Sequence, residues 1–194
     1  EEVFEQQPTA VVAASRDPAA AALAQQLFST PTFRVYTSGD VTGTELAGSF
    51  KNVIAIAAGM CQGLGLGNNP RAALITRGLA EITRLGVALG AEPATFAGLA
   101  GVGDLVLTTC GVLSRNHSLG VALAQGQSLA EFSASHRAVV EGVHTAKVAL
   151  QLARRAGVEM PIAAQVAECL FAGKAPGQAI AELMERTPKP ELWT

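Results

Sequence analysis

Lys51 is the residue whose surroundings are most unusual for its type. No acidic residue lies three or four positions away to pair with it on a helix surface, where its neighbours are Ala47, Gly48, Ile54 and Ala55. A lone cation among apolar residues needs either water or an anionic partner. Two interpretations stay open: a lysine whose stem covers apolar surface while its ammonium stays in water, or a cation that serves an anionic substrate.

A second candidate site begins at Ser114, a residue type that commonly caps helix N-termini. The backbone N–H groups of a first helical turn are unpaired. Arg115 would add a guanidinium and Asn116 an amide donor beside them. Such a combination can hold a phosphate or a carboxylate. The alternative is an ordinary capped helix with Arg115 in solvent.

Asp104 follows a cluster of glycines at positions 98, 101 and 103. Its carboxylate could orient a cation or a substrate hydroxyl, or it could cap a helix predicted over residues 105–109. The three alternating glycines of residues 63–67 lack the strand–turn–helix context of a dinucleotide fingerprint, so we interpret them as a loop.

The histidines and cysteines lack the spacing of a metal site or of a disulfide framework, and no metal is expected. The histidines are scattered: His117, His136 and His144. The cysteines are three and far apart: Cys61, Cys110 and Cys169. We expect buried, reduced thiols, which fits a cytoplasmic protein.

The elements that must position these residues fall into two parts. Residues 8–15 and 33–37 read as strands around a helix near residues 19–28, a β-α-β unit of parallel-crossover size. From residue 42 onward the pattern is helical, with about eight helices punctuated by glycine and proline. They are predicted over residues 44–59, 68–90, 93–98, 105–109, 114–126, 141–156, 161–172 and 176–186, with a capping box at Ser128 and Glu131.

Composition excludes several classes of protein. The chain has 194 residues, 49% of them apolar and 15% charged, with a net charge of −2. A chain with this many apolar residues to bury is not expected to be disordered. The nearly balanced charge gives no sign of a basic surface that binds nucleic acid. Charged residues interrupt the most hydrophobic stretch, so we expect no membrane span. The acidic first residues do not fit a secretory signal.

Several segments, in order, resemble bacterial NAD(P)-dependent glycerol-3-phosphate dehydrogenases. The most specific is ELAGSFKNVIAIA at residues 45–57, which is similar to the helix that carries the active-site lysine of this family. The others are residues 63–67, 71–78 (RAALITRG), 98–108 (GLAGVGDLVLT), 114–116 and 139–142 (VVEG). The resemblance covers essentially the whole chain.

The resemblance implies a role for each matching residue. Lys51 matches the proton donor or acceptor, which also contacts the substrate. The positions that hold glycerol 3-phosphate match Lys51, Asp104, Ser114, Arg115 and Asn116, and those that reach the nicotinamide dinucleotide match Arg115, Val139 and Glu141. The cofactor is NAD or NADP. The implied reaction interconverts dihydroxyacetone phosphate and sn-glycerol 3-phosphate, which supplies glycerophospholipid synthesis.

The resemblance also implies the architecture. Residues 41–194 would be a mainly α substrate-binding domain of the 6-phosphogluconate dehydrogenase C-terminal type, and residues 1–40 the end of a Rossmann domain. The rest of that domain, with its G-x-G-x-x-G turn, is absent from this sequence. We therefore expect the C-terminal part of a longer enzyme, inactive alone.

Two alternatives from other classes remain at this stage: the helical domain of a related hydroxy-acid dehydrogenase, or a non-catalytic helical interaction module. The second would give Lys51 and Arg115 no reason to converge. The preference between NAD and NADP stays open, because the residue that reads the ribose 2′ position lies outside this sequence. The oligomeric state is open as well, a homodimer being one state that the sequence allows.

Overall fold

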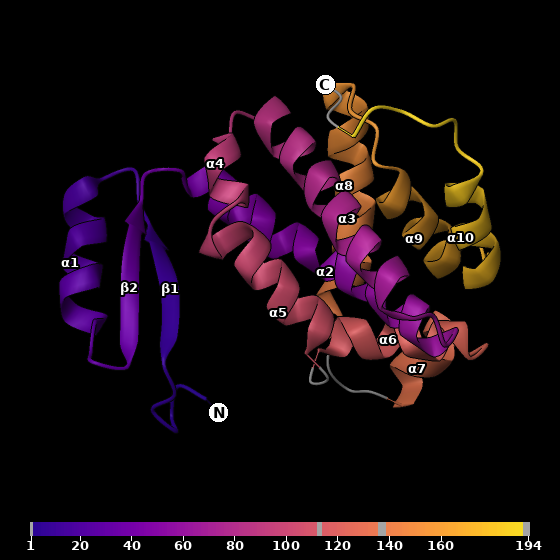
Figure 1. Ribbon diagram of the computed structural model, residues 1–194, viewed down its shortest axis with the longest axis horizontal. Coiled ribbons are helices and arrows are strands. Elements are labelled where there is room, and N and C mark those ends of the chain that lie inside the picture. The colour runs from indigo at the N-terminus through magenta and orange to yellow at the C-terminus, as the bar shows by residue number, and fades with distance from the viewer. Residues whose placement is uncertain (1, 112–113, 136–138, 192–194) are drawn as a thin grey trace.

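A small β-α-β unit forms the N-terminal end of the molecule. The computed structural model describes residues 2–111, 114–135 and 139–191; His136 and the last three residues lie outside them. Strands β1 (Thr9–Ala14) and β2 (Phe33–Ser38) pair in parallel, and α1 (Pro18–Phe28) connects them and packs on one face (Figure 1). The Asp17 side chain accepts the N–H of Ala19 and so caps α1. The predicted β-α-β unit is confirmed.

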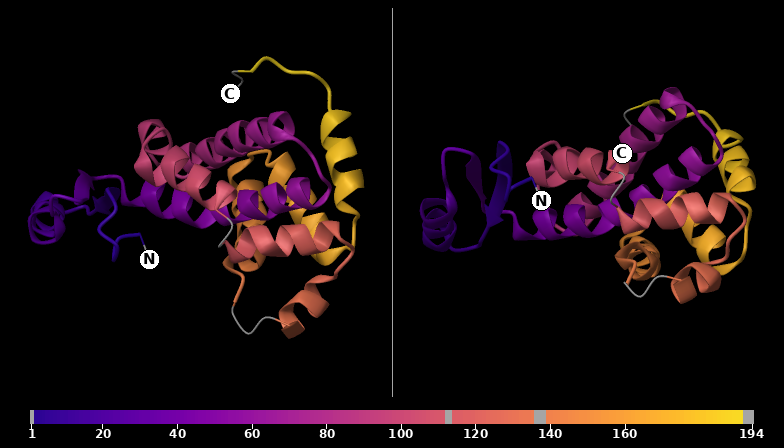
Figure 2. Two further views of the ribbon diagram at one scale, coloured as in Figure 1. Left: turned by 60° about the horizontal axis from the view of Figure 1, so that its bottom comes forward. Right: turned by 90° about the horizontal axis from the view of Figure 1, so that it is seen from below.

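The remaining elements form a helical body around one long central helix, α2 (Val41–Gly63). Figures 1 and 2 show α2 leaving the β-α-β unit and running through the middle of this body. The mainly helical fold predicted from the sequence is confirmed. The other helices are α3 (Asn68–Ala88), α4 (Pro93–Phe96), η1 (Leu99–Gly103), α5 (Asp104–Cys110), α6 (Arg115–Ala124), α7 (Leu129–Ser135), α8 (Glu141–Ala156), α9 (Pro161–Phe171) and α10 (Pro176–Met184).

Helix α2 is longer at both ends than the predicted residues 44–59. Its start is fixed by Asp40, whose buried carboxylate accepts hydrogen bonds from the N–H groups of Gly43 and Glu92 and from the Thr95 hydroxyl. Burial alone would raise the pKa of Asp40, but these three hydrogen bonds hold it below its usual value. The same side chain therefore caps α2 and ties it to α4.

Helix α2 continues past Gly59 because that glycine makes a helix contact rather than a helix end. A Cβ at Gly59 would overlap the carbonyl oxygen of His117, and one at Gly120 would overlap the carbonyl oxygen of Ile56. The two glycines thus let the backbones of α2 and α6 approach each other closely, as small residues do at tight helix crossings. This contact places the start of α6 beside α2.

The glycine-rich segment before Asp104 is helical rather than a series of broken turns. Residues Leu99–Gly103 form a π-helical turn that leads directly into α5. Asp104 has helical dihedral angles and is the first residue of α5, so its side chain does not cap that helix. The π-helical turn leaves the carboxylate free to point toward α2.

One expectation about exposure needs correction. Cys61 and Cys169 are buried as expected, but Cys110, the last residue of α5, is exposed. Among the described residues, one helical window, Pro93–Cys110, is long and apolar enough to cross a membrane by length and composition alone. It is weak evidence of a span, since a turn at residues 97–98 interrupts it and Asp104 lies within it.

Candidate active site

Lys51 and Asp104 form an ion pair that joins α2 to α5. The Lys51 Nζ lies 2.5 Å from both carboxylate oxygens of Asp104, and the two side chains are 22% and 32% exposed. The acid that the sequence around Lys51 lacks therefore comes from 53 positions along the chain. An ammonium held in this way stays open to solvent on one side, where it could meet a substrate oxygen.

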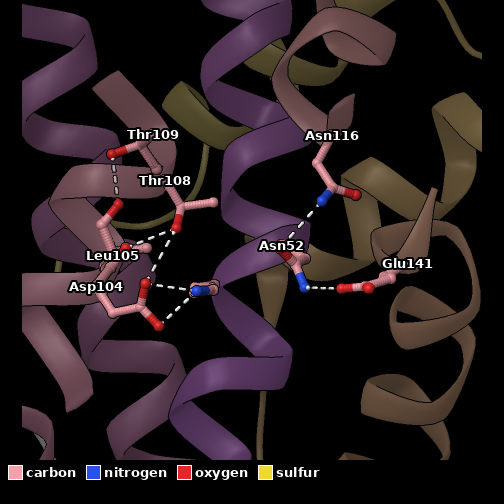
Figure 3. A network of polar contacts seen from close by, with 8 residues as sticks. Asn52, Asp104, Leu105, Thr108, Thr109, Asn116 and Glu141 are labelled. Carbon is pink, nitrogen blue, oxygen red and sulfur yellow. Dashed lines mark hydrogen bonds and ion pairs between the residues drawn. The ribbon is translucent and has the colours of Figure 1, made fainter. Parts of the chain in front are cut away.

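Thr108 fixes the orientation of Asp104. It lies one helical turn after Asp104, and its hydroxyl contacts both the backbone carbonyl of Asp104 at 2.7 Å and the carboxylate oxygen Oδ1 at 3.4 Å (Figure 3). Of the two interpretations left open for Asp104, the structure shows the one in which the carboxylate orients a cation.

Asn52, the next residue on α2, begins a second set of hydrogen bonds. Its side chain is buried; its Nδ2 donates to Glu141 Oε2 at 3.2 Å, and its Oδ1 accepts from Asn116 Nδ2 at 3.0 Å. Asn116 Oδ1 in turn accepts the N–H of Gly142 at 2.9 Å. Figure 3 shows this amide network across α2 from Asp104. The two helix starts at α6 and α8 are thereby tied to the helix that carries Lys51.

Gly142 is required at the end of this network. A Cβ at that position would lie 2.6 Å from Asn116 Oδ1 and 2.8 Å from the carbonyl oxygen of Asn52. Only glycine lets the first turn of α8 come close enough to donate its N–H to Asn116.

The three residues of the predicted anion site at the start of α6 differ in burial and in hydrogen bonding. Ser114 caps the helix, accepting the N–H of His117 at 3.3 Å, as predicted. Asn116 is buried; its amide donates one N–H to Asn52 and accepts the N–H of Gly142, so it also ties α6 into the network. Arg115 is exposed, and no ion pair joins it to the residues that the structure describes.

Besides Arg115, the two other residues expected to reach a dinucleotide lie at the start of α8. Val139 is 75% exposed, and the exposed Glu141 touches the amide network through Asn52. An exposed guanidinium at α6 and an exposed apolar side chain before α8 fit a dinucleotide, which carries phosphate charge and flat apolar rings. In the described part of the chain, no group of three His, Cys, Asp or Glu residues could hold a metal ion.

Two residues of this arrangement escaped the sequence analysis: Asn52 and Thr108. Each gave a weak signal, since Asn52 is a polar residue between Lys51 and an apolar run and Thr108 lies four positions after Asp104. The partners of Asn52 lie on α6 and α8, so sequence reasoning about one helix at a time could not find them. Thr108 bonds to Asp104 on its own helix, but the sequence does not show that this carboxylate holds Lys51 of α2.

Comparison with known proteins identifies the relatives of this arrangement. Residues 40–181 match the family described as NAD-dependent glycerol-3-phosphate dehydrogenase C-terminus. A Geobacter sulfurreducens glycerol-3-phosphate dehydrogenase [NAD(P)+] is 60% identical over 192 residues, which is 99% of this chain and 57% of that protein. The Koribacter versatilis protein of the same name is 55% identical, again over 99% of this chain and 57% of the relative.

Solved structures agree. The crystal structure of glycerol-3-phosphate dehydrogenase from Coxiella burnetii superimposes with a TM-score of 0.91 at 42% identity, covering 95% of this chain and 57% of that one. The yeast glycerol-3-phosphate dehydrogenase structure gives a TM-score of 0.84 at 26% identity, covering 95% and 56%. The chain thus spans somewhat more than half the length of the relatives that it matches.

Proposed function

The chain belongs to the family of NAD-dependent glycerol-3-phosphate dehydrogenases, as a match to their C-terminal part, and from this premise we propose that it is the substrate-binding part of such an enzyme. The reaction interconverts dihydroxyacetone phosphate and sn-glycerol 3-phosphate with NAD(P)H or NAD(P)+. Its product would supply glycerophospholipid synthesis. The observation that carries the proposal is the partly exposed ion pair of Lys51 and Asp104.

Lys51 is the proposed acid/base. Reduction of the ketone places negative charge on the carbonyl oxygen, and an adjacent ammonium stabilises that charge and gives up a proton to it. In the reverse direction the neutral amine accepts the proton from the alcohol. Asp104, held by Thr108, keeps Lys51 Nζ in place between these steps. The nicotinamide, when bound, supplies or accepts the hydride.

The start of α6 is the proposed site of the phosphate group. Arg115 brings a guanidinium that can contact phosphate with two N–H groups, and the first-turn N–H groups of α6 add donors. The amide network of Asn52 and Asn116 fixes this helix start relative to Lys51. The substrate would be held at its phosphate end while the ketone end reacts.

Arg115, Val139 and Glu141 are the proposed contacts to the dinucleotide, whose main binding domain would precede this chain. Residues 1–40 would be the end of that domain and residues 41–194 the substrate domain. The parallel β-α-β unit and a family match that starts at residue 40 support this boundary.

Location and assembly belong to the same proposal. A cytoplasmic enzyme fits the three cysteines, which are all free. A homodimer is the assembly proposed for the complete enzyme, and light scattering after size-exclusion chromatography distinguishes it from a monomer.

The proposal is tested with the chain joined to its dinucleotide-binding domain. We expect oxidation of NADH or NADPH with dihydroxyacetone phosphate, and no such activity from the 194-residue chain alone. Dihydroxyacetone, which lacks the phosphate, should lose at least about 100-fold in kcat/KM, because the α6 site stays empty. Faster turnover of pyruvate or another keto acid than of dihydroxyacetone phosphate would favour the hydroxy-acid alternative instead.

A further inference from the structure

A cavity of about 570 Å³ lies at the end of the helical body away from the β-α-β unit. It is bounded by α3, the start of α9, α10 and the segment that follows α10. Figures 1 and 2 show this segment leaving α10 and passing back toward α3. The volume is within the range of natural small-molecule sites. None of the residues that line the cavity belongs to the proposed active site.

One wall of the cavity is a basic stripe of α3. Arg77, Glu81 and Arg84 follow one another at spacings of four and three, so all three lie on the helix face that borders the cavity. Glu81 is 2% exposed and directs its carboxylate to the N–H groups of Ile162 and Ala163. The Glu81 carboxylate is therefore already hydrogen-bonded to the first turn of α9.

Arg77 is the cation that the fold leaves available. It is partly buried, and its Nη1 donates a hydrogen bond to the backbone carbonyl oxygen of Glu191 at 3.2 Å. No carboxylate among the described residues forms an ion pair with it. The positive charge of Arg77 also acts unfavourably on Arg84, about two turns further along the stripe. A bound anion between the two guanidinium groups would relieve that repulsion.

The opposite wall of the cavity is apolar. Ile180, Leu183 and Met184 of α10 face the cavity, and Met184 is 81% exposed. The segment beyond α10 is fixed over this space by Glu159, whose carboxylate pairs with Arg186 at 3.0 Å and with Lys189 at 3.3 Å. The cavity thus has one cationic wall, one apolar wall and a cover held by ion pairs.

We propose that this cavity binds a small amphipathic monoanion, a carboxylate on an apolar chain of about ten carbon atoms. The carboxylate lies at Arg77, where the planar guanidinium offers two N–H donors. The chain lies against Ile180, Leu183 and Met184, where its burial removes apolar surface from water. The site adds a ligand to this protein that the proposed dehydrogenase reaction does not use.

Isothermal titration calorimetry with sodium decanoate tests the proposal on the unmodified chain. We expect one saturable site per chain. Hexanoate should bind at least about tenfold more weakly, because it buries four fewer methylene groups. Decan-1-ol should also bind at least about tenfold more weakly, because it lacks the charge that pairs with Arg77. These comparisons need no variant and no catalytic activity, so their failure is independent of the proposed function.

A variant then locates the site. Arg77→Gln should weaken decanoate binding at least about tenfold, whereas Arg155→Gln should not change it, because Arg155 is exposed on α8 outside the cavity. Arg77→Lys keeps the charge and should retain part of the affinity. Absence of saturable decanoate binding, or equal affinity of the wild-type and Arg77→Gln chains, would overturn the proposal.

Discussion

Asp104 and Glu81 both use a carboxylate to tie one helix to another, but they do so in opposite environments. Asp104 is about one-third exposed and holds an ammonium from α2. Glu81 is 2% exposed and accepts the N–H groups of Ile162 at 2.7 Å and Ala163 at 3.3 Å. Burial raises the pKa of Glu81 to about 7, although its hydrogen bonds and the nearby Arg84 and Arg186 act in the other direction.

The difference shows that the same chemical group has different roles in different surroundings: the carboxylate of Asp104 belongs to the proposed active site, and the carboxylate of Glu81 to the packed core. The Lys51–Asp104 pair is partly exposed, so the substrate of the proposed reaction would reach Lys51 without a change of fold. Glu81 is enclosed and caps α9, whose own N-cap residue Met160 offers no side-chain hydrogen bond. Its contribution is therefore to stability, and changes at the two sites should affect different measurements.

The largest effect is expected for Lys51→Met in the complete enzyme. Loss of a positioned proton donor typically lowers kcat by about 10²–10⁴-fold, which is roughly 3–5 kcal/mol. Stability should change little, because the Asp104 carboxylate that loses its partner is partly exposed to water. Steady-state kinetics and thermal unfolding measure the two effects on the same samples.

Lys147→Met is the matched control for this prediction. Lys147 is exposed on α8 and lies over the ring of Phe171, outside the proposed site. Its kcat should equal that of the wild type. A Lys51→Met enzyme that keeps kcat within about threefold of wild type would be incompatible with the acid/base role.

Glu81→Ala should unfold at a clearly lower temperature and cost about 2–4 kcal/mol of unfolding free energy. The substitution leaves two buried N–H groups of α9 without their acceptor and opens a void beside α3. Chemical denaturation measures the change. The comparison of the two carboxylates predicts a smaller loss for Asp104→Ala, so an equal or larger loss at Asp104 would contradict it.

The pH dependence of stability should separate Glu81 from the exposed acids. Its pKa is about 7 in the folded chain and near 4.3 in an unfolded one, so between these values the folded state holds the extra proton. Stability therefore falls as pH rises through this window and levels off above pH 7, by up to about 4 kcal/mol. Glu81→Gln removes this slope.

Urea unfolding at a series of pH values gives the difference between the two chains directly. The acids whose pKa is lowered, Asp40 and Glu159 among them, act at lower pH and with the opposite sign. They are present in both chains and cancel in the comparison. Parallel curves for the wild type and Glu81→Gln from pH 5 to 7 would mean that Glu81 is ionised throughout.

The smallest expected effect concerns Arg115. Arg115→Gln in the complete enzyme should raise KM for dihydroxyacetone phosphate about tenfold while kcat changes less, because a charged contact to the phosphate is lost and the Lys51 pair is untouched. KM for the dinucleotide should also rise. Unchanged KM values for both ligands would remove Arg115 from the site.

The sequence by itself determined the local elements and the family. The serine before α6 and the capping box of Ser128 and Glu131 are signals carried within a few residues, and both were confirmed. The family resemblance of residues 45–57 was likewise readable, because the residue types around Lys51 are themselves the signal.

Only the tertiary structure decided which residues meet. Asp104 pairs with Lys51 over a sequence separation of 53 residues, and Glu81 bonds to Ile162 of α9 over a separation of 81. Contacts between residues so far apart in the sequence cannot be detected from the local periodicity of apolar residues. The sequence placed Asn116 at the start of a helix beside Arg115, but it could not reveal that Asn52 and Gly142 bind its amide. Hydrogen-bond partners of buried polar groups depend on which helices pack together, and that packing is set by the whole chain.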